Sequence, residues 1–240
     1  MAAILDLLSD TKHRPFALPA GNWQYYQEWN NALFLHWKVP FEELRSCVPE
    51  NLELDEFEGE FYVSLVAFRM QKIRPKNLPS VNFISDFEEI NLRTYVVKDG
   101  KAGVYFMNIE AENYLSAWVA RKLSGLPYEK SKISRIGNQF NSTNKLKNFK
   151  LHAEFEIREI LSEKSHLDKW LTERYCLYLD ENEQLFRFDI HHREWEIRKV
   201  GMKNLDLIYR FKNDYLIDKN PDLVHYSKGV QVIAWQKVRV

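Results

Sequence analysis

The alternation of apolar and polar residues along the chain predicts a mainly β protein. Segments rich in aromatic and β-branched residues recur from the first quarter of the chain to its end. The expected strands cover residues 32–39, 61–70, 89–97, 104–109, 151–160, 174–179, 185–191 and 230–238. Asp99-Gly100, followed by Gly103, is typical of a hairpin turn between the third and fourth of these strands.

Helical patterns are few. Pro40 begins a short helix that Pro49 ends, residues 113–123 carry apolar side chains at helical spacing, and a further short helix is expected at 167–172. Residues 138–149 are polar and rich in Asn, so we interpret them as an exposed loop. Because no long linker divides the chain, we expect one domain over residues 1–240, with residues 1–21 docked on it.

The strand expected at 89–97 has one polar and one apolar face, because side chains alternate along a strand. The polar face carries Glu89, Asn91, Arg93 and Tyr95. In a β-barrel the apolar face needs cover from helices or loops, so we expect the polar face to line the lumen. An isolated buried charge is costly, so Arg93 needs a partner, either a carboxylate such as Glu173 or a bound anion.

Three interpretations of this polar row stay open at this point. Glu89, Arg93 and Glu173 could form a structural ion-pair network. Alternatively, Arg93 holds a ligand carboxylate in a two-point contact, with Glu89 as acid or base and Asn91, Tyr95 and Glu173 beside the ligand. In the third interpretation the row is exposed to solvent.

Histidines are the second group of candidates. Alternation in the strand at 185–191 turns His192 toward the core and His191 toward polar surroundings. His192 is then either a hydrogen-bonded core residue or a proton-transfer group facing the cavity. A metal site would need further ligands such as His36 or His225, and their spacing does not support one. We therefore expect no metal and no cofactor, and treat His225 as a candidate ligand contact.

Composition excludes several classes of protein. Apolar residues make up 45% of the chain, enough for a core, and 34 Lys and Arg balance 34 Asp and Glu, so we expect no nucleic-acid partner. Cys47 and Cys176 lie in no CxxC pair, which excludes a thiolate zinc site and favours a reducing cytoplasm. We expect neither a signal peptide nor a membrane-spanning segment. Whether the chain forms homo-oligomers stays open.

Five segments together carry a family resemblance. They are WNNALFLHW at 29–37, FEEINLRTYV at 87–96, LTERYCLY at 171–178, IHHREW at 190–195 and HYSKGVQVIAW at 225–235. In order and spacing, from about Arg14 onward, they resemble the bacterial YqjF-like family of the acetoacetate decarboxylase-like superfamily. The resemblance implies an antiparallel β-barrel or cone with a few helices packed outside.

The resemblance also bears on chemistry. In the decarboxylase pattern a Gly-x-Pro turn precedes two lysines; the first forms a Schiff base and the second lowers its pKa. Here Tyr128 and Glu129 follow that turn, and Lys130 and Lys132 are shifted along the chain. Tyrosine cannot form an imine, so the resemblance implies binding or conversion of a small carboxylate- or carbonyl-bearing molecule without a Schiff base, with Tyr128 at the cavity wall. The alternative is a non-catalytic structural or regulatory partner protein with a filled barrel.

Overall fold

The computed structural model describes residues 2–81, 85–112, 125–211 and 215–240. Its helices are α1 (Ala2–Ser9), α2 (Phe41–Arg45) and α5 (His166–Thr172). Its strands are β1 (Tyr25–Lys38), β2 (Glu53–Leu54), β3 (Tyr62–Pro75), β4 (Phe87–Lys98), β5 (Lys101–Ala111), β6 (Tyr128–Lys130), β7 (Lys132–Ile136), β8 (Gln139–Asn144), β9 (Phe149–Ile160), β10 (Cys176–Glu181), β11 (Gln184–His191), β12 (Arg198–Arg210), β13 (Leu216–Ile217), β14 (Leu223–Ala234) and β15 (Val238–Arg239). The helix expected at 113–123 lies outside the described residues.

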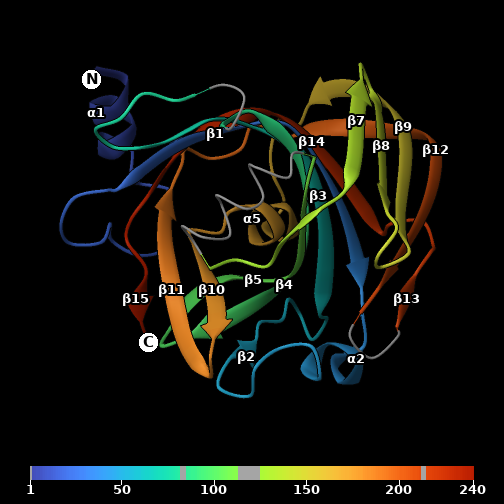
Figure 1. Ribbon diagram of the computed structural model, residues 1–240, viewed down its shortest axis with the longest axis horizontal. Coiled ribbons are helices and arrows are strands. Elements are labelled where there is room, and N and C mark those ends of the chain that lie inside the picture. The colour runs from blue at the N-terminus through green and yellow to red at the C-terminus, as the bar shows by residue number, and fades with distance from the viewer. Residues whose placement is uncertain (1, 82–84, 113–124, 212–214) are drawn as a thin grey trace.

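A closed barrel forms the centre of the molecule. Its strands pair in the order β11-β10-β5-β4-β3-β1-β14, and β11 pairs in turn with β14, which closes the ring (Figure 1). Pairing is antiparallel throughout the described sheet, except that β5 runs parallel to β10 and β6. Closure satisfies the backbone groups that an open edge would expose. The prediction of a mainly β fold built on a barrel is therefore confirmed.

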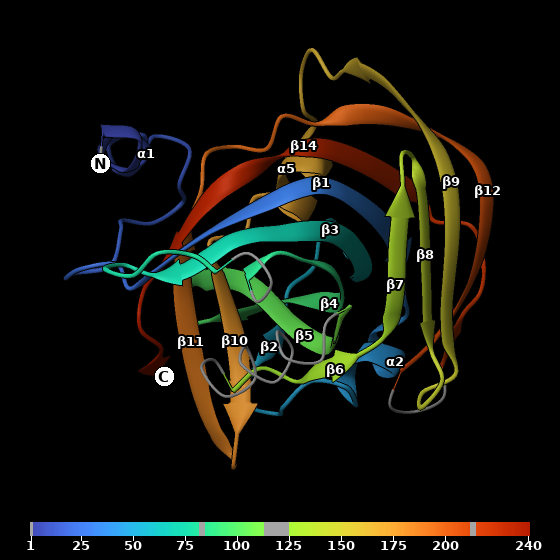
Figure 2. The same cartoon turned by 45° about the horizontal axis from the view of Figure 1, so that its top comes forward.

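A curved extension continues the sheet beyond the barrel. From β14 the hydrogen-bonded order runs on through β12, β9, β8 and β7, which stand together on one side of the molecule (Figure 2). The exposed loop expected at 138–149 was wrong, because half of that segment is β8, whose Phe140 is fully buried. The Asn, Ser and Thr side chains that follow Phe140 in β8 hid the alternation.

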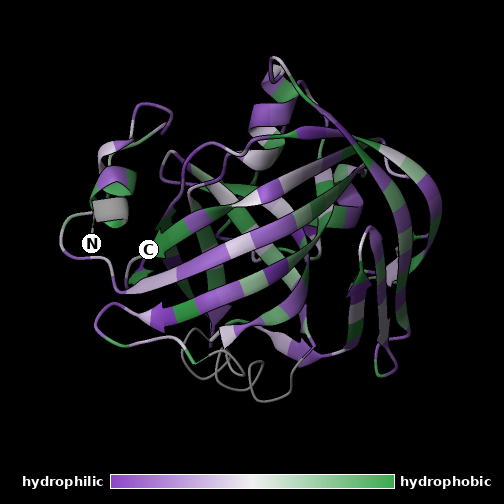
Figure 3. Cartoon of the chain, turned by 90° about the horizontal axis from the view of Figure 1, so that it is seen from above, coloured by the Kyte–Doolittle hydropathy of each residue, from purple (hydrophilic) through white to green (hydrophobic). Residues whose placement is uncertain are grey.

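Two apolar cores share the central strands β1, β3 and β4. Phe34 and Phe68 point into the barrel, whereas Leu35 and Leu92 point the other way and pack with Phe140 beneath the extension. Adjacent residues on a strand face opposite sides, so each core takes every second residue, and hydropathy alternates visibly along many strands (Figure 3). This double cover explains why the first ten residues of β4 are all buried, charged ones included.

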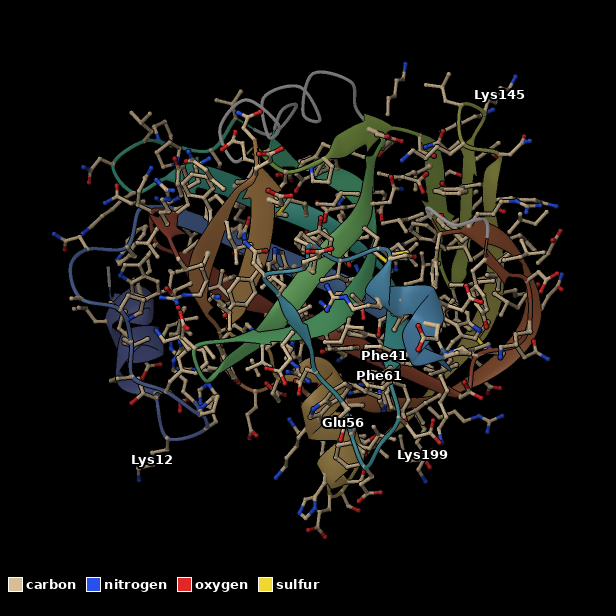
Figure 4. The ribbon with its side chains drawn as sticks, turned by 90° about the horizontal axis from the view of Figure 1, so that it is seen from below. Lys12, Phe41, Glu56, Phe61, Lys145 and Lys199 are labelled. Carbon is tan, nitrogen blue, oxygen red and sulfur yellow. The ribbon has the colours of Figure 1, made fainter. Side chains whose placement is uncertain are left out.

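The helices and the N-terminal segment pack on the outside of the sheet. Phe41, the first residue of α2, lies against Phe61 with ring centroids 5.2 Å apart (Figure 4). Leu7 of α1 is buried with Trp23 and Trp235, and its carbonyl accepts a hydrogen bond of 2.8 Å from His191 Nε2. No helix in the described ranges is long and apolar enough to span a membrane.

Candidate functional site: an aromatic cavity with a polar floor

The barrel encloses a cavity of about 350 Å³. Most of its wall is apolar, with rings from Trp29, Phe34, Phe68, Phe87, Phe106, Phe188 and Trp195. The polar side chains in its lining include Glu89, Asn91, Arg93 and Tyr128, together with Gln27, Arg74 and Ser85. The polar face of β4 therefore looks into the lumen, as its alternation predicts. No lysine is among the described residues that line the cavity.

Strand register brings these polar groups together. Glu89 and Asn91 lie two residues apart on β4, so both point to the same side of the sheet. Asn91 pairs with Ile109 of β5, and Ile109 pairs on its other side with Tyr128 of β6. Tyr128 is thus held across one strand from Asn91, and its hydroxyl donates a hydrogen bond of 2.9 Å to Glu89 Oε2.

Glu89 is a carboxyl group held in a low-dielectric environment. It is only 3% exposed, and burial raises its pKa to about 7, although hydrogen bonds from Tyr128 and Asn91 oppose the shift. Burial, together with the neighbouring Glu89 carboxylate, raises the pKa of Tyr128 well above its usual value. Glu89 can therefore hold or release a proton near neutral pH, while Tyr128 keeps its own proton and donates it to a hydrogen bond.

Arg93 is a buried cation with no counterion among the described residues. The side chain is 8% exposed, Nη2 donates a hydrogen bond of 3.5 Å to the Leu171 carbonyl, and the Tyr95 hydroxyl is a second polar neighbour. Nε of Arg93 and Oδ1 of Asn91 are buried and unbonded among the described residues, and no carboxylate there lies within ion-pair distance of Arg93. The ring of Phe34 lies 5.8 Å from the guanidinium carbon. Arg93 therefore carries an unpartnered donor and Asn91 an unpartnered acceptor, and both residues line the cavity.

Glu173 does not pair with Arg93, so the ion-pair network expected between them was wrong. Its carboxylate accepts hydrogen bonds from Lys164 Nζ and from the Tyr175 hydroxyl, each at 2.7 Å, and from the Trp195 backbone N–H at 3.0 Å. Lys164 is the cation that pairs with Glu173, so Glu173 does not balance the charge of Arg93. Glu173 is absent from the described cavity wall.

The remaining candidates lie outside the cavity wall. His192 is fully buried, with Nδ1 2.7 Å from the Arg193 carbonyl and its ring packed on Tyr175 and Trp195, as in a hydrogen-bonded core histidine. His191, which was expected in polar surroundings, is buried under the N-terminal segment, where its ring nitrogens contact the Arg14 guanidinium and the Leu7 carbonyl. Tyr95 and His225 belong instead to a buried polar chain behind the cavity.

That chain crosses the barrel wall from β4 to α5. The Tyr95 hydroxyl lies 2.6 Å from Ser64 Oγ, which lies 2.6 Å from His36 Nδ1. His36 Nε2 lies 3.1 Å from His225 Nδ1, and His225 Nε2 lies 2.8 Å from Asp168 Oδ1. The hydrogen bond from His225 lowers the pKa of Asp168 to about 2, whereas burial lowers the pKa of His36 well below its usual value.

Sequence reasoning missed Ser64, Asp168 and the role of His36, because these partners come from four strands and a helix up to 189 residues apart. The described residues hold no group of three or more His, Cys, Asp or Glu side chains arranged to bind a metal ion. The polar side chains from Tyr95 to Asp168 therefore form a network of hydrogen bonds. One end of this network is Asp168, which belongs to the capping box of α5.

Comparison with solved structures defines the class of fold. The barrel and its extension match an acetoacetate decarboxylase from Legionella pneumophila at 14% identity, covering 97% of this chain and 95% of that one, with a TM-score of 0.59. They match equally an enduracididine biosynthesis enzyme, MppR, solved in complex with pyruvate, at 9% identity, covering 94% and 93% of the two chains, with a TM-score of 0.60. The protein thus has the acetoacetate decarboxylase-like fold.

Comparison of sequences then gives the family. Residues 26–231 match DUF2071, a family of uncharacterized conserved proteins. The chain is also 33% identical to the uncharacterized protein YqjF of Bacillus subtilis, over 93% of this chain and 96% of that protein. The chain belongs to the DUF2071 family.

Proposed function

We propose that the barrel cavity binds a small molecule that carries a carboxylate or carbonyl group, and that it does so without forming a Schiff base. Arg93 holds the carboxylate, Glu89 supplies or accepts a proton, and Tyr128 orients the ligand through its hydroxyl. The observation that carries the proposal is the buried guanidinium of Arg93, whose Nε lacks a hydrogen-bond partner among the described residues at the wall of an open cavity.

An uncompensated buried cation is costly, and an anionic ligand removes that cost. The planar guanidinium matches the two oxygens of a carboxylate in geometry as well as in charge. The pyruvate bound to MppR, which has the same fold at 9% identity, gives the proposal a precedent in ligand class. A cavity of about 350 Å³ argues against the alternative of a filled barrel with a purely structural or regulatory role.

The proposal of a site without Schiff-base chemistry is supported by the group that stands after the Gly125-x-Pro127 turn. Tyr128 occupies that position, and its hydroxyl donates to Glu89. Lys130 and Lys132 are not among the lining residues. We place the protein in a reducing cytoplasm, which the free thiols of Cys47 and Cys176 support.

The test is a calorimetric titration of the protein with carboxylates from pyruvate to octanoate. Arg93→Lys should weaken binding about tenfold or more, because an ammonium group cannot reproduce the two-point contact. Arg93→Met should abolish carboxylate binding yet fold normally, because no described carboxylate depends on Arg93 for its charge balance. Unchanged carboxylate affinity in the Met variant would refute the proposal.

A further inference from the structure

We propose that the ligand is an amphipathic acid with an extended apolar chain, bound head-first with its carboxylate at Arg93 and its chain along the barrel axis. This inference rests on the proposed carboxylate contact at Arg93 and adds the chemistry of the rest of the molecule. Acids as small as pyruvate would satisfy the polar end of the cavity and leave its apolar walls in contact with water.

The cavity is deep, and its polar end lies opposite the end that opens to solvent. Along β4 the residues Phe87, Glu89, Asn91 and Arg93 all line it, and six residues of strand span roughly 20 Å. Arg93, at one limit of this row, is 8% exposed. At the other limit the cavity is lined by Leu78 and Val81, which are 59% and 49% exposed. The mouth therefore lies at the Leu78 end and the guanidinium lies at the bottom.

Partner strands confirm the direction of this axis. Arg93 pairs with Ser64 on β3, Glu89 with Phe68 and Phe87 with Met70, so β3 runs from the bottom toward the mouth. Tyr25, at the start of β1, pairs with Pro75 at the end of β3, and both line the cavity at the mouth. The lining residues from the Leu78 end to Arg93 therefore follow most of the length of β3.

The wall along this path is suited to an apolar chain. Between Arg93 and the mouth the described lining is dominated by aromatic and aliphatic side chains, among them Val66, Phe68 and Met70 of β3. Glu89 is the one carboxyl group among the described lining residues, and its hydrogen bonds from Tyr128 and Asn91 engage both of its oxygens. A chain of methylene groups would displace water from this wall without breaking the hydrogen bonds of Glu89.

Leu78 allows the apolar path to be tested without disturbing the fold. It is 59% exposed and lies at the mouth, so only a ligand long enough to reach the rim can contact it. Leu146 is a matched control, because it is 93% exposed and is not among the lining residues. Leu78→Ser and Leu146→Ser make the same chemical change at two surface positions, where substitutions rarely alter stability.

The experiment is a titration with butanoate, octanoate and dodecanoate, each below its aggregation concentration, and with dodecanol. We expect the Kd to fall about three- to fourfold for each added methylene, as for full burial of that group. Leu78→Ser should weaken binding of dodecanoate and leave butanoate unchanged, while Leu146→Ser should alter neither. Arg93→Met should remove the preference for dodecanoate over dodecanol.

Each failure has a separate meaning. Equal affinity for all three acids, lost in Arg93→Met, would overturn the extended-chain ligand and leave the carboxylate contact standing. Dodecanol binding as tightly as dodecanoate to the wild-type protein would overturn both, because the head group would then play no part. If none of the four probes binds, the extended-chain ligand and the carboxylate contact are both overturned.

Discussion

Glu89 links the electrostatics of the site to the stability of the whole chain. Its folded-state pKa of about 7 lies above the ordinary value of 4.5, because burial disfavours the charged form. Below about pH 4.5 the carboxyl is protonated in both folded and unfolded states. Between these values the unfolded chain releases the proton while the folded chain keeps it, so stability falls as the pH rises.

The expected loss is about 3 kcal/mol between about pH 4.5 and about pH 7, since each unit of pKa difference is worth about 1.36 kcal/mol. Urea unfolding at about pH 5 and about pH 8 measures it. Glu89→Gln is the control, because a neutral amide removes this contribution and should flatten the difference. If the wild type and Glu89→Gln lose stability equally over this range, Glu89 does not carry the raised pKa.

Tyr128→Phe provides a second test of the pKa of Glu89. The hydrogen bond from Tyr128 lowers the pKa of Glu89, so its removal should move that pKa further above 7. In an infrared pH titration of the folded protein, the carboxyl band that Glu89→Gln removes should titrate at higher pH in Tyr128→Phe than in the wild type. A shift to lower pH would mean that the hydroxyl does not stabilise the carboxylate.

At the scale of single residues, alternation predicted which side chains would face the lumen but not how they would be partnered. Glu89, Asn91 and Arg93 follow from the two-residue period of one strand. The partner of Glu173 could not be predicted that way, because Lys164 competes with Arg93 for it and only the fold decides which cation is closer. The interpretation in which the polar row of β4 is exposed to solvent is excluded by the burial of Glu89, Asn91, Arg93 and Tyr95.

Helix α5 is tied to the barrel by the hydrogen-bonded chain that runs from Asp168 to Tyr95 and back to the Leu171 carbonyl. The chain has five contacts, each of which needs one proton. Neutral His225, neutral His36, Ser64 and Tyr95 together supply four protons. Neutral side chains therefore leave one of the five contacts without a proton.

The contact between β5 and β10 depends on a residue without a side chain. A Cβ at Gly103 would lie 2.6 Å from Cys176 Sγ and 2.7 Å from the Cys176 carbonyl, and the backbone cannot yield. Gly103→Ala should destabilise the protein by roughly 1–3 kcal/mol in urea unfolding. Gly201→Ala is the control, because its Cβ would meet only the exposed guanidinium of Arg158, and we expect a change within about 0.5 kcal/mol. Equal effects would mean that the strands separate easily.

Strands with a buried, largely apolar face could be predicted, and mostly exposed ones could not. The barrel strands β1, β3, β4, β5, β10, β11 and β14 each had a counterpart among the sequence expectations, although bounds differed by several residues. Strand β12 was missed because only Leu207 and Tyr209 of its residues are buried, and because an extra residue between Met202 and Asn204 shifts its register against β9. Pairing partners this distant leave no signal in a local pattern.

At the scale of the whole molecule, the fold is shared far more widely than any one chemistry. The chain superposes on acetoacetate decarboxylase over nearly its full length at 14% identity, which establishes the barrel and nothing about the reaction. What differs is the set of side chains around the lumen. The described part of this wall holds a tyrosine and a carboxyl group in mutual contact, with a guanidinium nearby, and no amine.

The decarboxylase reaction requires a neutral amine that condenses with a ketone, and the protonated imine then accepts the electrons released as carbon dioxide leaves. Tyr128 cannot condense with a ketone, and the negative charge of Glu129 would raise the pKa of a nearby amine rather than lower it. We therefore expect no decarboxylation of acetoacetate and no mass increase after borohydride is added with a β-keto acid. Peptide mass spectrometry provides the measurement, with a decarboxylase of the same fold as the positive control.

A reduced adduct on Lys130 or Lys132 would mean that the amine has moved along the chain and reaches the cavity by another route. An unmodified protein whose carboxylate affinity still depends on Arg93 would leave the ligand held by charge and hydrogen bonds alone.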